Sequence, residues 1–275
     1  METEERVARH YGRGRLEEAI LAAAKAAGKD TAQLTASDLT AVDEFHVGGL
    51  EATQMLARGM GLRTDMELLD VGCGIGGPAR YFAAEQNCRV TGIDLTEEFV
   101  RTAESLTKLV KLDVRVGFKR ASALAMPFAE ESFDGTYMIH VGMNLADKPG
   151  VFREVGRVLK RGSRFTIFDL MRVREGSLRF PLPWAASEET SFVAEAAKYR
   201  EALEAAGFEV EKQQSHRTFA IEFMQRMASR LAAIGPPALG LHVLMGEKTP
   251  LMLKNVLEGM AEGLFDVVEM TGKKK

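Results

Sequence analysis

The sequence predicts an α/β fold built on a parallel, doubly wound sheet. From residue 67 onward, short apolar segments with strand character alternate with longer segments of helical pattern. This alternation is typical of parallel sheets that carry helices on both faces. The first strand also runs directly into a glycine-rich turn, Gly72-Cys73-Gly74-Ile75-Gly76-Gly77. Glycines at such a turn let a ligand approach the backbone closely, because no β-carbon blocks it.

The region before the alternating strands is helical in pattern. The predicted helices are Leu16–Ala27, Ala32–Leu39 and Leu50–Met60. A break at Asp43-Glu44-Phe45-His46-Val47-Gly48-Gly49 separates the second helix from the third. We therefore expect a helical cap over residues 1–60, followed by the main domain over residues 61–275.

The main domain opens with five strands that alternate with three helices. The predicted strands are Glu67–Val71, Arg89–Asp94, Val114–Lys119, Phe133–Ile139 and Arg164–Asp169. The predicted helices are Ala79–Glu85, Thr96–Val110 and Pro149–Leu159. Because the strands lead into helices, the sheet formed by these segments should be parallel.

Past Leu170 the alternation loosens. The predicted helices there are Ala194–Ala206, Phe219–Ile234 and Thr249–Glu262, and the predicted strands are Glu209–Arg217 and Phe265–Thr271. Two of the helices fall between the last two strands. We expect them to form a helical insertion, at about residues 218–263, that covers a pocket.

The composition is typical of a soluble globular protein. The chain has 275 residues, of which 46% are hydrophobic and 27% charged, and a formal net charge of −3. This charge gives no reason to expect a nucleic-acid partner. No apolar run reaches the roughly 20 residues that span a bilayer, and the acidic N-terminus lacks a signal-peptide core. Cys73 and Cys88 are isolated, which favours a reducing compartment. A cytoplasmic location is therefore expected, and no metal-ligand spacing is present.

Two carboxylates decide what the glycine turn is expected to bind. Gly72, Gly74 and Gly77 alone satisfy the dinucleotide fingerprint G-x-G-x-x-G. Asp70, however, would repel a pyrophosphate and attract a cation, and S-adenosylmethionine (SAM) carries both an ammonium and a sulfonium. Asp94 follows Gly72 by 22 positions and is placed to accept hydrogen bonds from ribose hydroxyls.

Four short motifs follow one another within residues 62–170. They are D-x-G-x-G-x-G at Asp70–Gly76, the acid Asp94, P-F and S-F-D within Pro127–Asp134, and R-V-L-K-x-G at Arg157–Gly162. In this order and spacing they resemble class I SAM-dependent methyltransferases. The resemblance implies a Rossmann-like, seven-stranded, mostly parallel sheet with an antiparallel last strand. It also implies SAM as the cofactor and S-adenosylhomocysteine as the product.

The resemblance also implies a set of cofactor-binding residues. They are Asp70, Gly72, Cys73, Gly74, Gly76, Asp94, Leu95, Ser122, Ala123 and His140. The chain departs from the family at Ser122, where an acid usually binds the adenine amino group. It departs again at Arg161-Gly162-Ser163, where the usual sequence is P-G-G, a change that a turn tolerates.

A narrower resemblance lies outside these motifs. It is carried by His10-Tyr11, Asp43–Gly49, His140–Asn144 and Phe180–Trp184 with Ser191-Phe192. Together they resemble bacterial small-molecule enzymes of methyltransferase type 11. That group includes sarcosine/dimethylglycine N-methyltransferases and is related to sugar O-methyltransferases and to ubiquinone-pathway C-methyltransferases. The resemblance implies a small-molecule acceptor, with an amine nitrogen favoured. The methionine-rich insertion favours the alternative, O- or C-methylation of a larger natural product or quinone. A nicotinamide-dependent dehydrogenase and a non-catalytic SAM-binding protein are more distant alternatives.

Methyl transfer from a sulfonium is an in-line displacement, which requires positioning and sometimes a base. His140, at the carboxyl end of the fourth strand, is the first candidate for that base, with packing under the cofactor as the alternative. His46 is the second candidate. The residues expected to contact substrate are Tyr11, His46, Asn144 and Trp184. No metal is required, and a homodimer is left open.

Overall fold

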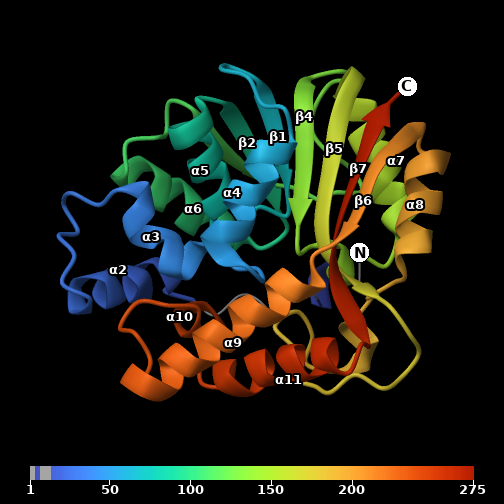
Figure 1. Cartoon of the computed structure of the whole chain (residues 1–275). Coiled ribbons are helices and arrows are strands. Elements are labelled where there is room, and N and C mark those ends of the chain that lie inside the picture. Colours follow the sequence, from blue (N-terminus) through green and yellow to red (C-terminus); the bar gives the residue numbers. More distant parts are fainter. Residues whose placement is uncertain (1–3, 7–13) are drawn as a thin grey trace.

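The computed structural model describes residues 4–6 and 14–275, and these form a seven-stranded sheet flanked by helices (Figure 1). The strand order is β3-β2-β1-β4-β5-β7-β6, and β7 runs antiparallel to both of its neighbours. The strands are β1 Glu67–Val71, β2 Arg89–Asp94, β3 Val116–Arg120, β4 Phe133–Ile139, β5 Leu159–Arg172, β6 Phe208–Ser215 and β7 Phe265–Lys274. The predicted fold class is confirmed.

Helices cover both faces of this sheet. They include α5 Gly77–Gln86, α6 Glu97–Leu109, α7 Lys148–Val158 and α8 Ala196–Ala205. On one face, Phe82 of α5 packs in an apolar cluster with Tyr137 of β4. On the other face, Phe152 of α7 and Tyr199 of α8 pack in a second cluster with Phe165 of β5. Burial of these two clusters holds the parallel strands in place, so that their carboxyl ends form one edge.

The first described helices are α2 Leu16–Ala26, α3 Ala36–Asp43 and α4 Gly49–Gly59. The predicted helix Ala32–Leu39 is wrong by about one turn. The physical reason is a capping box, in which Thr35 and Asp38 each bond the backbone N–H of the other. This arrangement satisfies donors that a helix end leaves unpaired and sets the helix start at Ala36.

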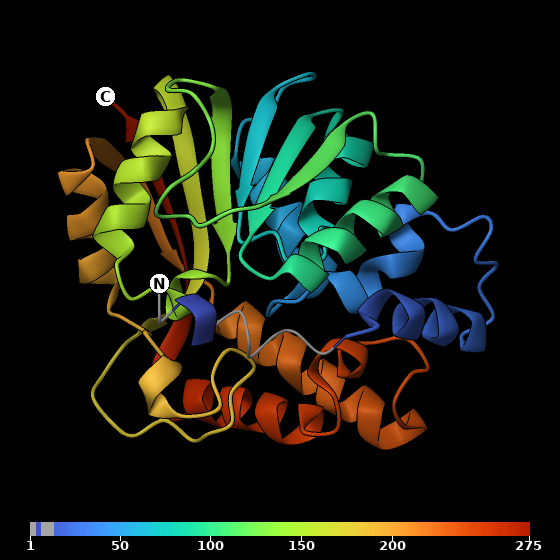
Figure 2. The same cartoon turned by 180° about the vertical axis from the view of Figure 1, so that it is seen from behind.

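Three helices between β6 and β7 lie under the carboxyl edge of the sheet (Figures 1 and 2). They are α9 Arg217–Ile234, α10 His242–Met245 and α11 Thr249–Ala261. We call them the lid helices. Within the described part of the chain, no helix combines the length and the apolar character needed to cross a membrane. The division into a cap and a main domain stays a prediction.

Several predicted boundaries shift in the structure. Strand β5 begins at Leu159 and includes Gly162, whose φ of 77° favours glycine. Strand β6 ends at Ser215, so Arg217, which was expected to end that strand, instead begins α9. The lid helix α9 therefore starts only two residues after the sheet, and the lid is joined closely to the core.

Candidate functional site

The glycine loop joins β1 to α5 and is packed from two directions. Gly72 has a φ of 76°, and a β-carbon there would lie 2.5 Å from a methyl group of Val141. A β-carbon on Gly77 would lie 2.3 Å from the Asp43 carbonyl oxygen. Glycine is therefore required at Gly72 by both the backbone conformation and the neighbouring side chain, and at Gly77 by the neighbouring chain segment.

Asp94 connects the end of β2 to this loop. One of its carboxylate oxygens accepts a hydrogen bond from the Gly74 N–H at 3.0 Å, and the other accepts from the Thr96 N–H at 2.8 Å. Burial raises the pKa of Asp94, while these backbone donors partly offset the rise. The carboxylate thus sits at the carboxyl edge of the sheet with its position set by two backbone groups.

Asp70 lies at the centre of the same edge with an unsatisfied oxygen. Its side chain is 3% exposed, and Oδ2 has no hydrogen-bond partner among the described residues. Burial raises its pKa to about 8, the Tyr137 hydroxyl offsets part of this rise, and the negative charges of Asp94 and Glu44 add to it. A buried carboxylate of this kind is stabilised by a cationic ligand, because the ligand's charge favours the ionised form.

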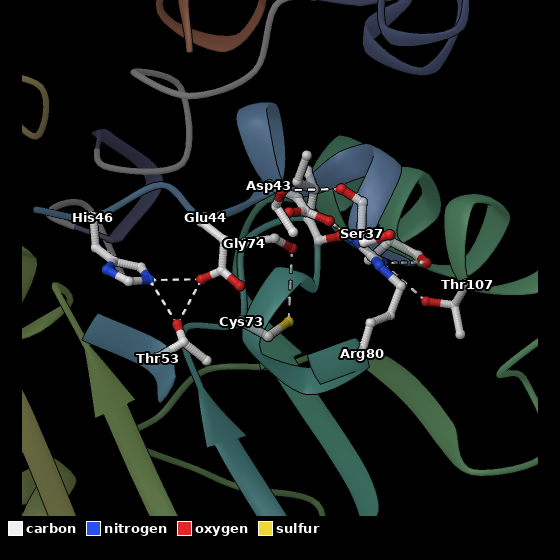
Figure 3. A network of polar contacts seen from close by, with 12 residues as sticks. Ser37, Asp43, Glu44, His46, Thr53, Cys73, Gly74, Arg80 and Thr107 are labelled. Atoms are coloured by element: carbon white, nitrogen blue, oxygen red, sulfur yellow. Dashed lines mark hydrogen bonds and ion pairs between the residues drawn. The ribbon is translucent and has the colours of Figure 1, made fainter. Parts of the chain in front are cut away.

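A second polar cluster lies opposite the loop, in the segment before α4 (Figure 3). The His46 Nε2 atom lies 2.8 Å from Glu44 Oε2, and the Thr53 hydroxyl donates to the same oxygen at 2.6 Å. The side chains of Glu44 and His46 are almost completely buried. Glu44 Oε1 has no hydrogen-bond partner among the described residues. Sequence reasoning named His46 here but missed Glu44, although both belong to the Asp43–Gly49 motif.

Arg80 fastens this segment to the glycine loop (Figure 3). Its guanidinium donates to Asp43 at 2.7 Å, to the Ile75 carbonyl at 2.7 Å and to the Thr107 hydroxyl at 2.9 Å. Burial raises the pKa of Asp43 to about 6 even though the Arg80 charge opposes the rise. Sequence reasoning missed Arg80, because an arginine on a helix face gives no sign of a partner 37 positions away.

His140 follows β4 in an uncommon backbone conformation, with a φ of 53°. Non-glycine residues with positive φ are rare and gather at functional sites. The Val47 N–H donates to His140 Nε2 at 3.4 Å, and Nδ1 has no partner among the described residues. Burial and the nearby His46 hold the pKa of His140 well below 6.5. The ring is therefore neutral at pH 7, and its centre lies 5.9 Å from that of His46.

The remaining predicted site residues differ in their surroundings. The Ser122 hydroxyl donates to the carboxylate of Glu4. Asn144 ends a short 3-10 turn, Gly142–Asn144, at the same edge of the sheet. Trp184 is only 2% exposed, and its indole donates to Ser191 Oγ at 3.0 Å. Tyr11, together with His10, lies outside the described residues.

One cavity of about 820 Å³ connects these features. Most predicted site residues line it, namely Asp70, Gly72, Cys73, Gly74, Asp94, Leu95, Ala123, His46, His140, Asn144 and Trp184. Gly76 and Ser122 are not part of its lining. The opposite wall comes from the lid helices and is mainly apolar, with Phe223, Met224, Met227, Leu231, Met245 and Leu253. The binding and catalytic roles of all these residues stay predictions.

Comparison with known families identifies the central region. Residues 69–167 match the family model described as the methyltransferase domain. This region is a class I methyltransferase domain. The family predicted from the four motifs is thereby confirmed, and the members of this family are SAM-dependent enzymes. The match runs from within β1 to within β5 and includes the glycine loop, Asp94 and His140.

Three known proteins show how far the similarity extends. A stretch of 114 residues, 42% of this chain, is 38% identical to cycloartenol-C-24-methyltransferase of Arabidopsis thaliana and corresponds to 34% of that protein. The chain therefore spans about a third of that relative's length. The structure of the [4+2]-cyclase SpnF has a TM-score of 0.65 at 25% identity, over 81% of this chain and 80% of that one. A chain from Galdieria sulphuraria, assigned to the sarcosine dimethylglycine methyltransferases, has a TM-score of 0.67 at 18% identity, over 82% and 85% of the two chains. At that identity, the last comparison supports the fold alone.

Proposed function

We propose that this chain is a SAM-dependent methyltransferase that acts on a small-molecule acceptor. The proposal is carried by the continuity of the 820 Å³ cavity. At one end, this cavity reaches Asp70 and Asp94 beside the glycine loop, and at the other it reaches the apolar wall of the lid helices. Ligand cavities in proteins commonly measure about 300–1,000 Å³, and this volume lies in the upper part of that range.

The residues around the glycine loop fit SAM. The unpartnered Asp70 oxygen can be stabilised by a cation or by a hydrogen-bond donor of the ligand. Asp94 can accept hydrogen bonds from the hydroxyl groups of a ribose. The loop itself leaves open space at Gly74, where a β-carbon would meet nothing within 4 Å. When bound, SAM supplies an electrophilic methyl group on a sulfonium.

The residues between the two ends of the cavity would orient the acceptor. His140 is neutral, and so it can hydrogen-bond a neutral nucleophile without adding charge repulsion. His46 is held by Glu44 and faces the same cavity. The lid helices place an apolar wall beside the reacting groups, which would limit the access of water and competing hydrolysis.

For the methylated atom we propose an amine nitrogen, the acceptor favoured by the sequence resemblance. A protonated amine must lose its proton before the nitrogen lone pair can attack the methyl group, and two histidines adjoin the cavity to accept it. O- or C-methylation of a larger apolar acceptor is the second candidate. The observation that favours it is the methionine- and leucine-rich wall contributed by α9, α10 and α11.

The test is incubation of the purified chain with methyl-labelled SAM and a panel of acceptors. The panel pairs small amines of the glycine type with apolar alcohols and quinones. Release of S-adenosylhomocysteine together with a labelled product supports the proposal, and the labelled atom decides between nitrogen, oxygen and carbon. The product must be detected directly, since the neighbour with 25% identity is described as a cyclase. SAM binding without any labelled product across the panel would contradict methyl transfer.

A further inference from the structure

We propose that Glu4 binds the exocyclic amino group of the cofactor's adenine, in the position where β3 ends. This inference rests on the proposed function. It assigns a cofactor contact to the N-terminal segment, far in sequence from the methyltransferase domain at residues 69–167.

The order of the strands places the adenine near the end of β3. The glycine loop follows β1, Asp94 ends β2, and Ser122 comes two residues after β3 ends at Arg120. These strands are parallel neighbours, so their carboxyl ends lie in a row. If a ligand contacts the glycine loop and its ribose hydroxyls donate hydrogen bonds to Asp94, its base therefore extends toward residues 121–124.

The loop after β3 lacks an acidic side chain of its own. Residues 121–129 read Ala-Ser-Ala-Leu-Ala-Met-Pro-Phe-Ala. Ser122 is the polar residue among them, but its hydroxyl proton is directed to the Glu4 carboxylate, and its oxygen accepts from the Leu124 N–H at 3.1 Å. Ser122 therefore serves mainly to hold Glu4 in place.

Glu4 carries the acceptor capacity that this end of the cavity otherwise lacks. Its side chain lines the cavity beside Ala123 and Leu124. An ionised carboxylate offers about four lone-pair directions, so it can accept hydrogen bonds from several donors at once. The adenine amino group is a double donor, and a charge-assisted hydrogen bond to it would distinguish adenine from a base that carries an oxygen at this position.

A second contact anchors the turn that carries Glu4. The Arg6 guanidinium lies 2.8 Å from Glu189 Oε2, on the 3-10 turn Glu188–Thr190. The N-terminal turn is thus attached to the β3 loop through Glu4 and to a separate surface loop through Arg6. Figure 2 shows this turn in dark blue at the carboxyl edge of the sheet, above the lid helices. Of the side chains in these two attachments, Glu4 is the one that lines the cavity.

The experiment compares two ligands by titration calorimetry on the full chain. The ligands are S-adenosylhomocysteine and S-inosylhomocysteine, which has an oxygen in place of the adenine amino group. The variant Glu4→Gln should weaken binding of the adenosyl ligand about tenfold or more, the usual effect of losing a charge-assisted hydrogen bond. It should not weaken binding of the inosyl ligand. The preference for the adenosyl over the inosyl ligand should therefore be lost. Glu5→Gln, at the exposed neighbouring residue, is the matched control and should keep the wild-type preference.

A rescue variant separates this contact from a general effect on the N-terminus. Ser122→Asp placed in the Glu4→Gln background should restore the preference for the adenosyl ligand, because it returns a carboxylate to the end of β3. If Glu4→Gln keeps the wild-type preference, the assignment of Glu4 is wrong while the SAM site stands. If the wild-type chain binds neither ligand, the proposed function fails.

Discussion

Asp94 accepts a 3.0 Å hydrogen bond from the backbone N–H of Gly74, which ties the last residue of β2 to the middle of the glycine loop. The same side chain accepts from Thr96 at the start of α6. One carboxylate therefore sets the shape of two ligand-facing segments before any ribose is bound. This double attachment leads to the first prediction.

Replacement of Asp94 by alanine should weaken SAM binding by at least about 100-fold. The change removes the ribose acceptor and leaves two partly buried backbone donors without this partner, each at a cost of up to about 1–3 kcal/mol. Titration calorimetry measures the effect. Asp113→Ala removes an exposed acid from the loop before β3 and serves as the control, since it should leave affinity unchanged. Wild-type affinity in Asp94→Ala would refute the assignment of the cofactor site.

The raised pKa of the Asp70 carboxyl group predicts that cofactor binding depends on pH. Burial raises its pKa to about 8, so the free protein holds a proton there at pH 7. A cationic ligand favours the ionised carboxylate, and binding should therefore release a proton below pH 8. SAM affinity should rise as pH increases from about 6 to 8 and level off above that. Calorimetry in buffers of different ionisation enthalpy measures the proton release directly.

The raised pKa of Asp70 also affects the stability of the free protein, but this stability falls with rising pH whereas SAM affinity rises. Because the folded-state pKa of Asp70 lies above its ordinary value of 3.8, its contribution to stability is present below pH 4. That contribution is lost as pH rises toward 8. Asp70→Asn should remove both effects. The control is Lys148→Arg, because the pKa of Lys148 is also about 8 but this residue does not line the cavity. Proton release that persists in Asp70→Asn would contradict the assignment.

The sheet and much of its ligand-facing edge could be predicted from the sequence, because both depend on local patterns. Strand β4, Phe133–Ile139, is rich in aromatic, β-branched and aliphatic residues that favour strands, and its predicted limits are those of the structure. The glycine loop is likewise recognised from its own residues. Glu44, Arg80 and Glu4 could not be found this way, since their partners lie on other elements. Which distant side chains meet depends on how the helices pack, and periodicity carries no such information.

His140 should be needed for turnover but not for cofactor binding. His140→Ala is expected to reduce methyl transfer at least about 100-fold, which is within the usual contribution of an acid–base group. SAM affinity, followed by calorimetry, should remain near that of the wild type. His140→Gly is the matched variant. It also lacks the imidazole but suits the φ of 53°, so it should be about 1 kcal/mol more stable than His140→Ala. Unchanged turnover in both variants would exclude a catalytic role for this ring.

The buried pair of Asp43 and Arg80 should be essential to the stability of the site. Their side chains are almost completely buried and lie 2.7 Å apart. Arg80→Met leaves the Asp43 carboxyl without its charge partner, which should lower the free energy of unfolding by about 3–5 kcal/mol. The double variant Asp43→Asn/Arg80→Met should lose less than the sum of the two single changes, because it leaves no unpaired charge. Urea denaturation of the four proteins measures both quantities, and strictly additive losses would show that the pair is not energetically coupled.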